Sequence, residues 1–105
     1  MASAPLELIY RKEAIRDLDA LFYYIAIDRP LAAERFLREI KRACEGLRWF
    51  PMIGRQLDPG DERVRVLTLR RRVAIKFLVH RGAVHILGIS YWGRDLQAFF
   101  AGRQP

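Results

Sequence analysis

The side chains that could do chemistry in this sequence are two histidines, a tyrosine and a group of cations in the second half of the chain. His80 and His85 are of the type that titrates near neutrality, and Tyr91 could donate a proton. Metal-free cleavage of an RNA phosphodiester would need such a base and acid, together with cations that hold the phosphate. The cations available for that task are Arg65, Arg70, Arg72, Lys76 and Arg94.

These residues lack the spacing of a metal site. No cysteine lies near His80 or His85, and the two histidines are not spaced as paired ligands. We therefore expect no metal and no cofactor, with structural roles for both histidines. Cys44 falls on an apolar helical stripe, which is typical of a small buried side chain rather than a nucleophile. Trp49 and Phe50, at the end of a predicted helix, are interpreted as core residues.

The positive charge is concentrated in the same half of the chain. Residues 1–50 contain nine Lys or Arg and eight Asp or Glu, a net charge of +1. Residues 51–105 contain ten and four, a net charge of +6. A field of that sign favours an acidic partner, either nucleic acid or an acidic protein segment.

Length and composition predict a single domain over residues 1–105. The one cysteine allows no internal disulfide, which fits a reducing compartment. The apolar runs are too short to span a bilayer. We therefore expect a cytoplasmic protein that does not associate with membranes.

Three consecutive strands must position the candidate residues. Runs of Val, Ile, Leu and Phe predict strands over Arg63–Leu69, Val73–His80 and Ala83–Ser90. The arginines Arg70–Arg72 occupy the first junction, and Arg81-Gly82 occupies the second. A two-residue turn at the second junction would need a positive φ at both residues, for which arginine is an imperfect choice.

Neither face of this sheet is predicted to be wholly polar, because side chains alternate along each strand. In the last strand we place Val84 and Ile86 on one face, and His85, Leu87 and Ile89 on the other. One face needs helices from the same chain. The other face is predicted to combine apolar and cationic residues, and is a poor face to leave in water; its members are Arg65, Leu67, Leu69, Lys76, Leu78 and His80.

The first half of the chain predicts the helical cover. Apolar residues recur at helical spacing over Lys12–Ile27 and again from Pro30 to about Trp49. The short link between these helices predicts an antiparallel hairpin. A short strand over Leu6–Tyr10 precedes the helices, Leu57–Glu62 is interpreted as a loop, and a short helix is predicted over Asp95–Phe100.

The predicted order is therefore β-α-α-β-β-β, which is an α+β domain with a helical hairpin packed on a small antiparallel sheet. Each helix should cover the sheet with one apolar stripe. The stripes expected to pack there are Ile15, Leu18 and Phe22 in the first helix, and Phe36, Ile40 and Cys44 in the second.

Several strings, taken in order, resemble the ParE branch of the RelE/ParE superfamily of bacterial toxins. The string RKEAIRDLDALFYYIAIDRPLAAERFLREI is similar to that family's first two helices, with Tyr24-Ile25 ahead of the Arg29-Pro30 junction. The string FPMIGRQ resembles its Pro-x-x-Gly-Arg turn, which ends here at Gly54-Arg55.

The closing string ILGISYWGRD resembles the family's last strand and its Arg-Asp ending, carried here by Arg94-Asp95. It departs from the family pattern in one respect, because Tyr91-Trp92-Gly93 stands where a His-Gly pair is common. The resemblance extends over roughly residues 6–100, which is nearly the whole chain.

The resemblance implies a toxin of a type II toxin-antitoxin system. Such a toxin is made with a cognate antitoxin, whose acidic or amphipathic segment wraps it in a hetero-oligomer. The mixed apolar and cationic face described above is accordingly assigned to antitoxin binding. ParE-type toxins are similar to inhibitors of DNA gyrase, whereas the RelE branch cleaves mRNA on the ribosome. Gyrase is therefore the expected target, and a ribosome-dependent ribonuclease is the alternative.

The residues expected to bind the target are of the types that dominate interfaces, Tyr, Trp and Arg. They are Tyr91, Trp92, Arg94, Arg70, Arg71 and Arg72. RelE-type enzymes resemble this chain less at their active site. Ala74 stands where they place an arginine, and Arg65 and Leu67 stand where they place paired lysines. No enzymatic activity is therefore expected, direct binding of nucleic acid is not favoured, and a non-toxic basic binding module is a third possibility.

Overall fold

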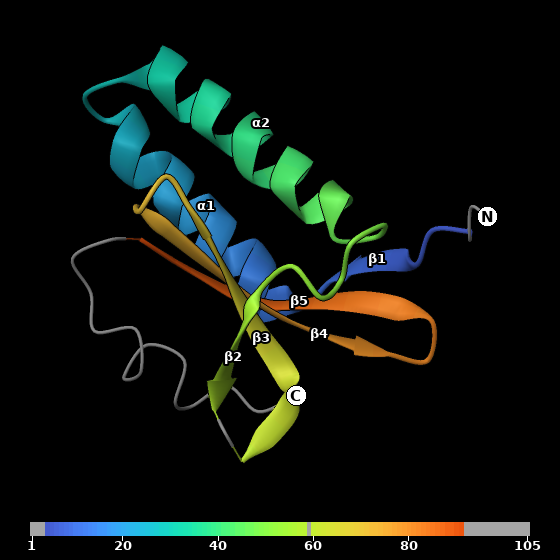
Figure 1. The fold of residues 1–105 in the computed structure, drawn as a ribbon. Coiled ribbons are helices and arrows are strands. Elements are labelled where there is room, and N and C mark those ends of the chain that lie inside the picture. Colours follow the sequence, from blue (N-terminus) through green and yellow to red (C-terminus); the bar gives the residue numbers. More distant parts are fainter. Residues whose placement is uncertain (1–3, 59, 92–105) are drawn as a thin grey trace.

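The computed structural model describes residues 4–58 and 60–91, which form two helices and a five-stranded sheet (Figure 1). The elements are β1 (Glu7–Tyr10), α1 (Lys12–Ala26), α2 (Pro30–Gly46), β2 (Arg55–Asp58), β3 (Asp61–Leu69), β4 (Val73–His80) and β5 (Ala83–Tyr91). The α+β class and the helical hairpin are confirmed. The predicted helix at Asp95–Phe100 lies outside the described residues.

The helices begin close to the predicted positions, and α2 ends earlier than predicted. Arg29 precedes α2 with non-helical backbone angles, and Pro30 occupies its first turn, where a missing N–H costs nothing. After Gly46 the next backbone N–H groups bond to carbonyls three residues back, as from Leu47 to Cys44 and from Trp49 to Gly46. The chain therefore tightens into turns before Trp49. Neither helix in the described part is long and apolar enough to cross a membrane.

The sheet is mixed, with strand order β1-β5-β4-β3-β2. The prediction of a wholly antiparallel sheet is corrected at one edge, where β1 pairs with β5 in parallel. The segment Leu57–Glu62, predicted as a loop, contributes residues to β2 and β3, which pair as antiparallel neighbours. The first difference arises from pairing between segments that are separated along the chain, which local sequence patterns do not report. The second is local, because β2 and β3 are consecutive strands and Asp58 pairs with Asp61.

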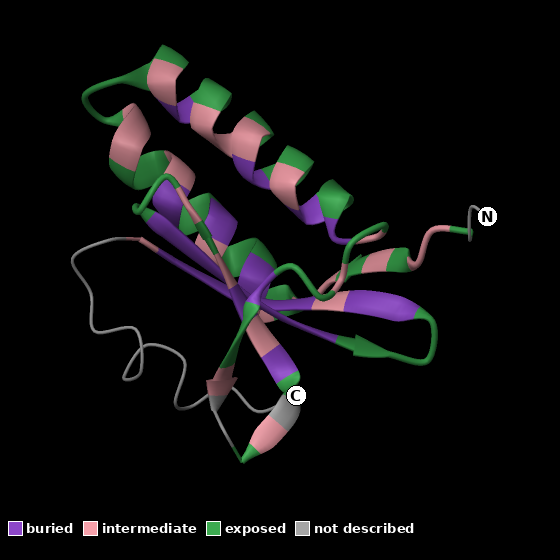
Figure 2. Ribbon diagram, viewed as in Figure 1, coloured by how far each residue is buried: buried purple, intermediate pink, exposed green. Residues whose placement is uncertain are grey.

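The helical hairpin covers one face of the sheet, and the buried residues of α1 and the central strands lie between them (Figure 2). In α1 the buried residues are Ala14, Leu18 and Leu21. Ile15 was predicted to belong to this stripe, but it is 48% exposed. It follows Ala14 by one residue, and one residue turns a helix by about 100°, which carries the side chain off the buried face.

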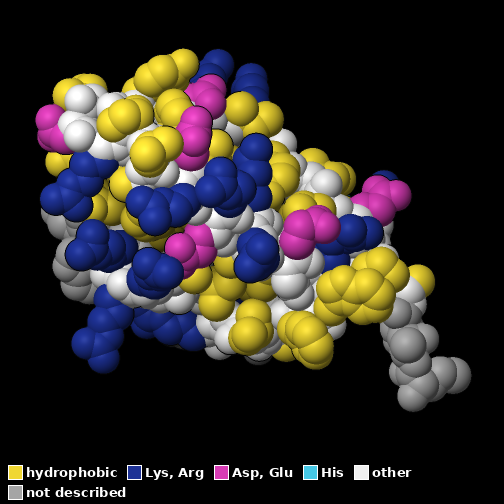
Figure 3. All heavy atoms as spheres, turned by 90° about the horizontal axis from the view of Figure 1, so that it is seen from above, with side chains coloured by type: hydrophobic (Ala, Val, Ile, Leu, Met, Phe, Trp, Pro, Cys, Tyr) yellow, Lys and Arg dark blue, Asp and Glu magenta, His cyan; other side chains and the backbone are white. Residues whose placement is uncertain are grey.

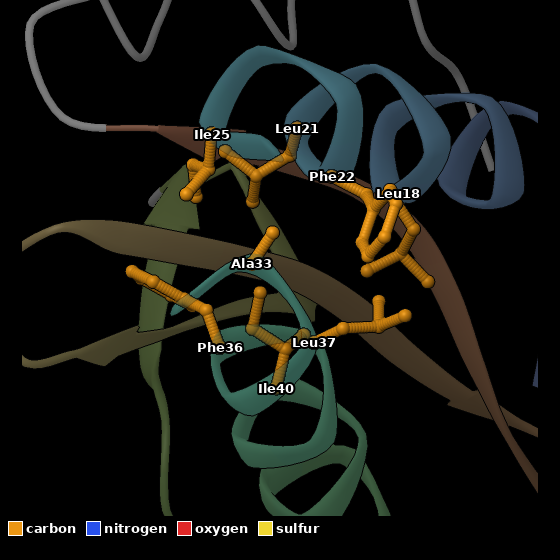
Figure 4. A pocket seen from close by; sticks show the side chains of 8 residues that line it. All are labelled: Leu18, Leu21, Phe22, Ile25, Ala33, Phe36, Leu37 and Ile40. Atoms are coloured by element: carbon orange, nitrogen blue, oxygen red, sulfur yellow. The ribbon is translucent and has the colours of Figure 1, made fainter. Parts of the chain in front are cut away.

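The two helices pack on each other through apolar side chains that leave no space for a water molecule (Figure 4). These side chains are Leu18, Leu21, Phe22 and Ile25 from α1, and Ala33, Phe36, Leu37 and Ile40 from α2. The two helices are therefore packed rigidly against each other, and a surface that they form with the sheet has a fixed shape.

A register shift in the β4–β5 pair changes which residues of β5 face the helices. Lys76 pairs with Gly88 and Phe77 pairs with Ile86, so Leu87 is an extra residue in β5. Beyond this bulge the alternation is reset, and Ile89 joins Ile86 in the core beneath the helices. The prediction that Ile89 shares a face with Leu87 is therefore wrong.

Candidate functional site

The β3–β4 turn carries three arginines in an unusual backbone conformation. Arg70 and Arg71 have φ values of 52° and 56°, in the left-handed region that favours Gly and Asn. The N–H of Arg72 closes the turn on the carbonyl of Leu69 at 3.0 Å. The backbone geometry alone would select Asn-Gly at these positions. The arginine side chains therefore need an explanation outside the turn.

Tyr91 lies beside this turn, although it is twenty residues away in the chain. It pairs with Val73, the residue directly after Arg72. Its ring centroid lies 6.0 Å from that of Tyr24 and 6.4 Å from that of Phe36, so it contacts both helices. The structure thus brings together two groups of predicted target-binding residues. The other two predicted members, Trp92 and Arg94, lie outside the described residues.

A cleft of about 510 Å³ opens between α2 and the β3–β4 turn. Its lining residues are Ala32, Arg35, Phe36, Glu39, Arg70 and Arg72. The carboxylate of Glu39 forms an ion pair with Arg70, with 2.5 Å between Arg70 Nε and Oε2, which orients that guanidinium group. Figure 3, which views the molecule from above, shows Lys and Arg side chains gathered over this side of the molecule. The sequence did not predict Arg35 and Glu39 as members of the site. They are neighbours of Arg70 and Arg72 only because α2 packs against the turn.

The histidines lie at the other end of β4. Arg11 Nε donates a hydrogen bond to His85 Nδ1 at 3.1 Å, and the His80 and His85 rings are 6.2 Å apart. Burial and the adjacent Arg11 charge lower the pKa of His85. His80 ends the strand that Val73 begins, and at about 3.3 Å per residue that is roughly 23 Å of strand. The candidate base therefore does not lie near the arginine turn. Among the described residues no cluster of His, Cys, Asp and Glu could hold a metal ion.

The six residues assigned to antitoxin binding do not share a face, so that prediction is corrected. Arg65 pairs with Phe77 across the β3–β4 ladder, and directly opposed residues point to the same side of a sheet. Arg65 and its alternates Leu67 and Leu69 therefore lie on the helix-covered side, where the two leucines contact the core. Lys76, Leu78 and His80 take the opposite side because they alternate with Phe77. Their role as antitoxin contacts stays a prediction.

Three of these residues are buried or engaged within the chain itself, and one of them is Lys76, which is only 6% exposed. Arg65 donates a hydrogen bond to the carbonyl of Gly54 at 2.6 Å. Leu78 is only 2% exposed and packs with Val64 and Leu87. Leu67 and Leu69 are half-buried. Only the leucines of β3 therefore retain substantial apolar surface that a partner can cover.

The structure also exposes aromatic side chains that were predicted to be core. Trp49 is 55% exposed and Phe50 is 69% exposed, and Met52 and Ile53 beside them are exposed as well. These residues follow the last buried residue of the α2 stripe, Leu47, so no helical face directs them inward. The end of the apolar stripe at Leu47 is therefore the feature of the sequence that could have predicted their exposure.

Comparison with known proteins identifies the family. Residues 8–95 match the family model described as the ParE toxin of the type II toxin-antitoxin system, parDE. The chain belongs to the ParE toxin family. It is therefore the toxin component of a type II toxin-antitoxin system, and the expected resemblance is confirmed.

Two relatives of this ParE-family toxin agree with the assignment. It is 31% identical over 88 residues to a protein named Toxin RelE2 from Caulobacter vibrioides, a match that covers 84% of this chain and 97% of the relative. It also shares its fold with a chain of the chromosomal ParDE TA system from P. aeruginosa, with a TM-score of 0.72 and 28% identity. That match covers 85% of this chain and 98% of the other.

Proposed function

We propose that this ParE-family toxin inhibits DNA gyrase by binding rather than by catalysis, and that a cognate acidic antitoxin neutralises it. The supporting observation is the separation of the candidate catalytic groups. A metal-free ribonuclease needs a base, an acid and cations within hydrogen-bond reach of one phosphate. His80 lies about 23 Å of strand away from the arginine turn and Tyr91. A binding surface requires no such convergence.

The proposed target-binding surface is the arginine turn together with Tyr91, and it continues along the chain into Trp92 and Arg94. Arg70 is oriented by Glu39, and Tyr91 is held against Phe36 and Tyr24. Side chains that are already oriented lose less entropy on binding, which favours their use as anchors.

The antitoxin is proposed to contact β3 on the helix-covered side. Leu67 and Leu69 are half-buried there, so a bound segment gains affinity by covering them. The net charge of +7 accelerates the approach of an acidic segment. His80, exposed on the opposite side of the sheet, is reached only by a segment that wraps around an edge, and Lys76 on that side is only 6% exposed.

Two reactions performed with purified toxin test this proposal. Gyrase supercoiling of relaxed plasmid should fall as toxin is added and should recover when the product of the neighbouring antitoxin gene is added. Ribosome-bound mRNA should remain intact in a parallel translation reaction. Cleavage of mRNA at codon-defined positions, with supercoiling unaffected, would contradict the proposal.

The alternative is a ribosome-dependent ribonuclease, and it is favoured by the name of one relative, Toxin RelE2. In that mechanism Tyr91 would protonate the leaving group and Arg94 would hold the phosphate. Tyr91→Phe and Arg94→Ala would then each abolish mRNA cleavage by an otherwise folded protein. Under the gyrase proposal there is no cleavage for these substitutions to remove.

A further inference from the structure

The cleft between α2 and the β3–β4 turn has an excess of positive charge. Arg35, Arg70 and Arg72 line it with one carboxylate, Glu39. Glu39 pairs with Arg70, whereas Arg35 and Arg72 form no ion pair with any residue that the structure describes. Both are exposed. Two guanidinium groups therefore remain available for an anion, and each can donate two parallel hydrogen bonds to a phosphate.

The turn conformation is an independent sign that these arginines serve a ligand. Two consecutive non-glycine residues, Arg70 and Arg71, occupy left-handed backbone conformations. Such conformations are unfavourable for most side chains and are found disproportionately where a ligand is bound. The β4–β5 turn uses the same conformation at Arg81 but follows it with Gly82. Of these two turns in the described part of the chain, the β3–β4 turn is the one whose arginines line the cleft.

The composition of the cleft favours a phosphodiester backbone over an acidic peptide. An acidic peptide takes much of its affinity from buried apolar anchors, and the cleft offers only Ala32 and Phe36 for them. The large exposed apolar side chains of the Trp49–Ile53 segment, which follows the other end of α2, do not line it. A nucleic-acid backbone presents closely and regularly spaced phosphates, and binds mainly through charge. Tyr24, 66% exposed beside Tyr91, adds a flat surface for a sugar or base.

We infer that this cleft binds the phosphodiester backbone of the DNA that gyrase holds. The toxin then contacts enzyme and DNA together, with Arg35 and Arg72 on phosphate oxygens and Arg70 held in place by Glu39. This inference rests on the proposed inhibition of gyrase, and it gives the arginine turn a specific ligand.

Binding to a labelled DNA duplex, measured by fluorescence anisotropy over a range of salt concentrations, tests the cleft directly. Two phosphate contacts predict a slope of log K against log salt of about −2. The double variant Arg35→Gln/Arg72→Gln should reduce that slope by about 2 and weaken binding at least tenfold. Arg81→Gln is the matched control, because it removes one arginine from the other hairpin turn. Thermal unfolding of each variant verifies that it is folded.

Two outcomes of this titration would overturn the inference. One is an equal loss of affinity per arginine in Arg81→Gln and in the double variant, which would mean that net charge alone binds DNA. The other is a polyglutamate chain that competes as well as DNA does at equal charge, which would mean that the cleft takes acidic peptides.

A second measurement separates this inference from the proposed function. The amount of cleaved DNA that gyrase retains is measured with wild-type toxin and with the single variant Arg35→Gln, and toxin binding to gyrase is measured without DNA. Arg35 lines the cleft from α2 and lies outside the proposed gyrase-binding surface, so Arg35→Gln should bind DNA-free gyrase normally and should retain at most half of the cleaved complex. Equal retention by both proteins would overturn the inference and leave gyrase inhibition standing. A wild-type toxin that binds DNA through the arginines but does not affect gyrase would support the cleft and overturn the proposed function.

Discussion

The carboxylate of Asp17 on α1 accepts a hydrogen bond from the backbone N–H of Ile89 on β5, with 2.9 Å between Oδ2 and N. The edge strand β1 pairs with β5 only as far as Ile86. A side chain of the covering helix thus provides an acceptor where the edge strand has ended, which satisfies a backbone group that the sheet leaves unpaired. The contact also ties α1 to β5 just beyond the β-bulge.

Replacing Asp17 should therefore destabilise the fold. Asp17→Ala removes a charge-assisted hydrogen bond and leaves a backbone N–H without this acceptor, a loss of about 2 kcal/mol. Urea unfolding followed by circular dichroism measures it. Asp19→Ala is the matched control, since Asp19 lies on the exposed side of the same helix and its loss should change stability by less than about 0.5 kcal/mol. Equal effects of the two substitutions would show that the hydrogen bond to Ile89 contributes little.

Gly54 should tolerate no side chain. A Cβ at this position would lie 2.8 Å from the Val66 carbonyl oxygen and 3.0 Å from the Phe77 ring. Gly54→Ala should therefore cost about 1–3 kcal/mol through forced movement of the sheet. Gly46→Ala is the control, because nothing lies within 4 Å of its added Cβ and alanine favours the helix. Thermal unfolding should give a lower Tm for the first variant and an unchanged or higher Tm for the second.

The left-handed backbone of the arginine turn should lower the stability of the protein, while its side chains should contribute to toxicity. Asn adopts left-handed angles more readily than Arg, so Arg71→Asn and Arg81→Asn should each stabilise the protein by about 0.5–1 kcal/mol. Only Arg71→Asn should also weaken growth arrest when the toxin is induced without antitoxin. Stability is measured by urea unfolding and toxicity by colony counts after induction. Full toxicity of a stabilised Arg71→Asn variant would place the target contact elsewhere.

The thiol of Cys44 should be unreactive in the native protein. Burial raises its pKa to about 11, an effect that the hydrogen bond with Tyr10 only partly offsets. Because the thiolate is the reactive species, iodoacetamide at pH 8 should label native protein slowly and protein in guanidinium chloride rapidly. Mass spectrometry of timed samples measures both rates. Fast labelling of the folded protein would mean that the region around Cys44 opens readily.

Stability should fall in mildly acidic solution because of His85. Burial and the Arg11 charge lower the pKa of His85 below its ordinary 6.5, so the unfolded chain binds this proton more readily than the folded one. The resulting stability is present above about 6.5 and is lost as pH falls from there toward the folded pKa. The decline in Tm over that interval should be shallower in His85→Asn. Arg11→Ala should make the decline only partly shallower, because this variant removes the Arg11 charge but keeps the burial of His85. An unchanged decline in His85→Asn would assign the pH dependence to other groups.

Local sequence patterns determined the helices and hairpins of this protein. The 3–4 spacing of apolar residues and Pro30 place both helices within a few residues of their observed bounds, because these signals depend only on near neighbours. The turn at Arg81-Gly82 lies at its predicted position for the same reason, and both residues adopt the positive φ that a two-residue turn needs.

The tertiary structure alone decided which residues form a site. The register of β3 on β4 places Leu67 opposite Ile75 and Leu78 opposite Val64, so Leu67 and Leu78 point in opposite directions despite their similar patterns. The meeting of Tyr91 with the arginine turn, and of both with α2, follows from strand register and helix packing. These are relationships between distant segments, and a side chain's neighbours across a sheet leave no periodic signal in its own strand.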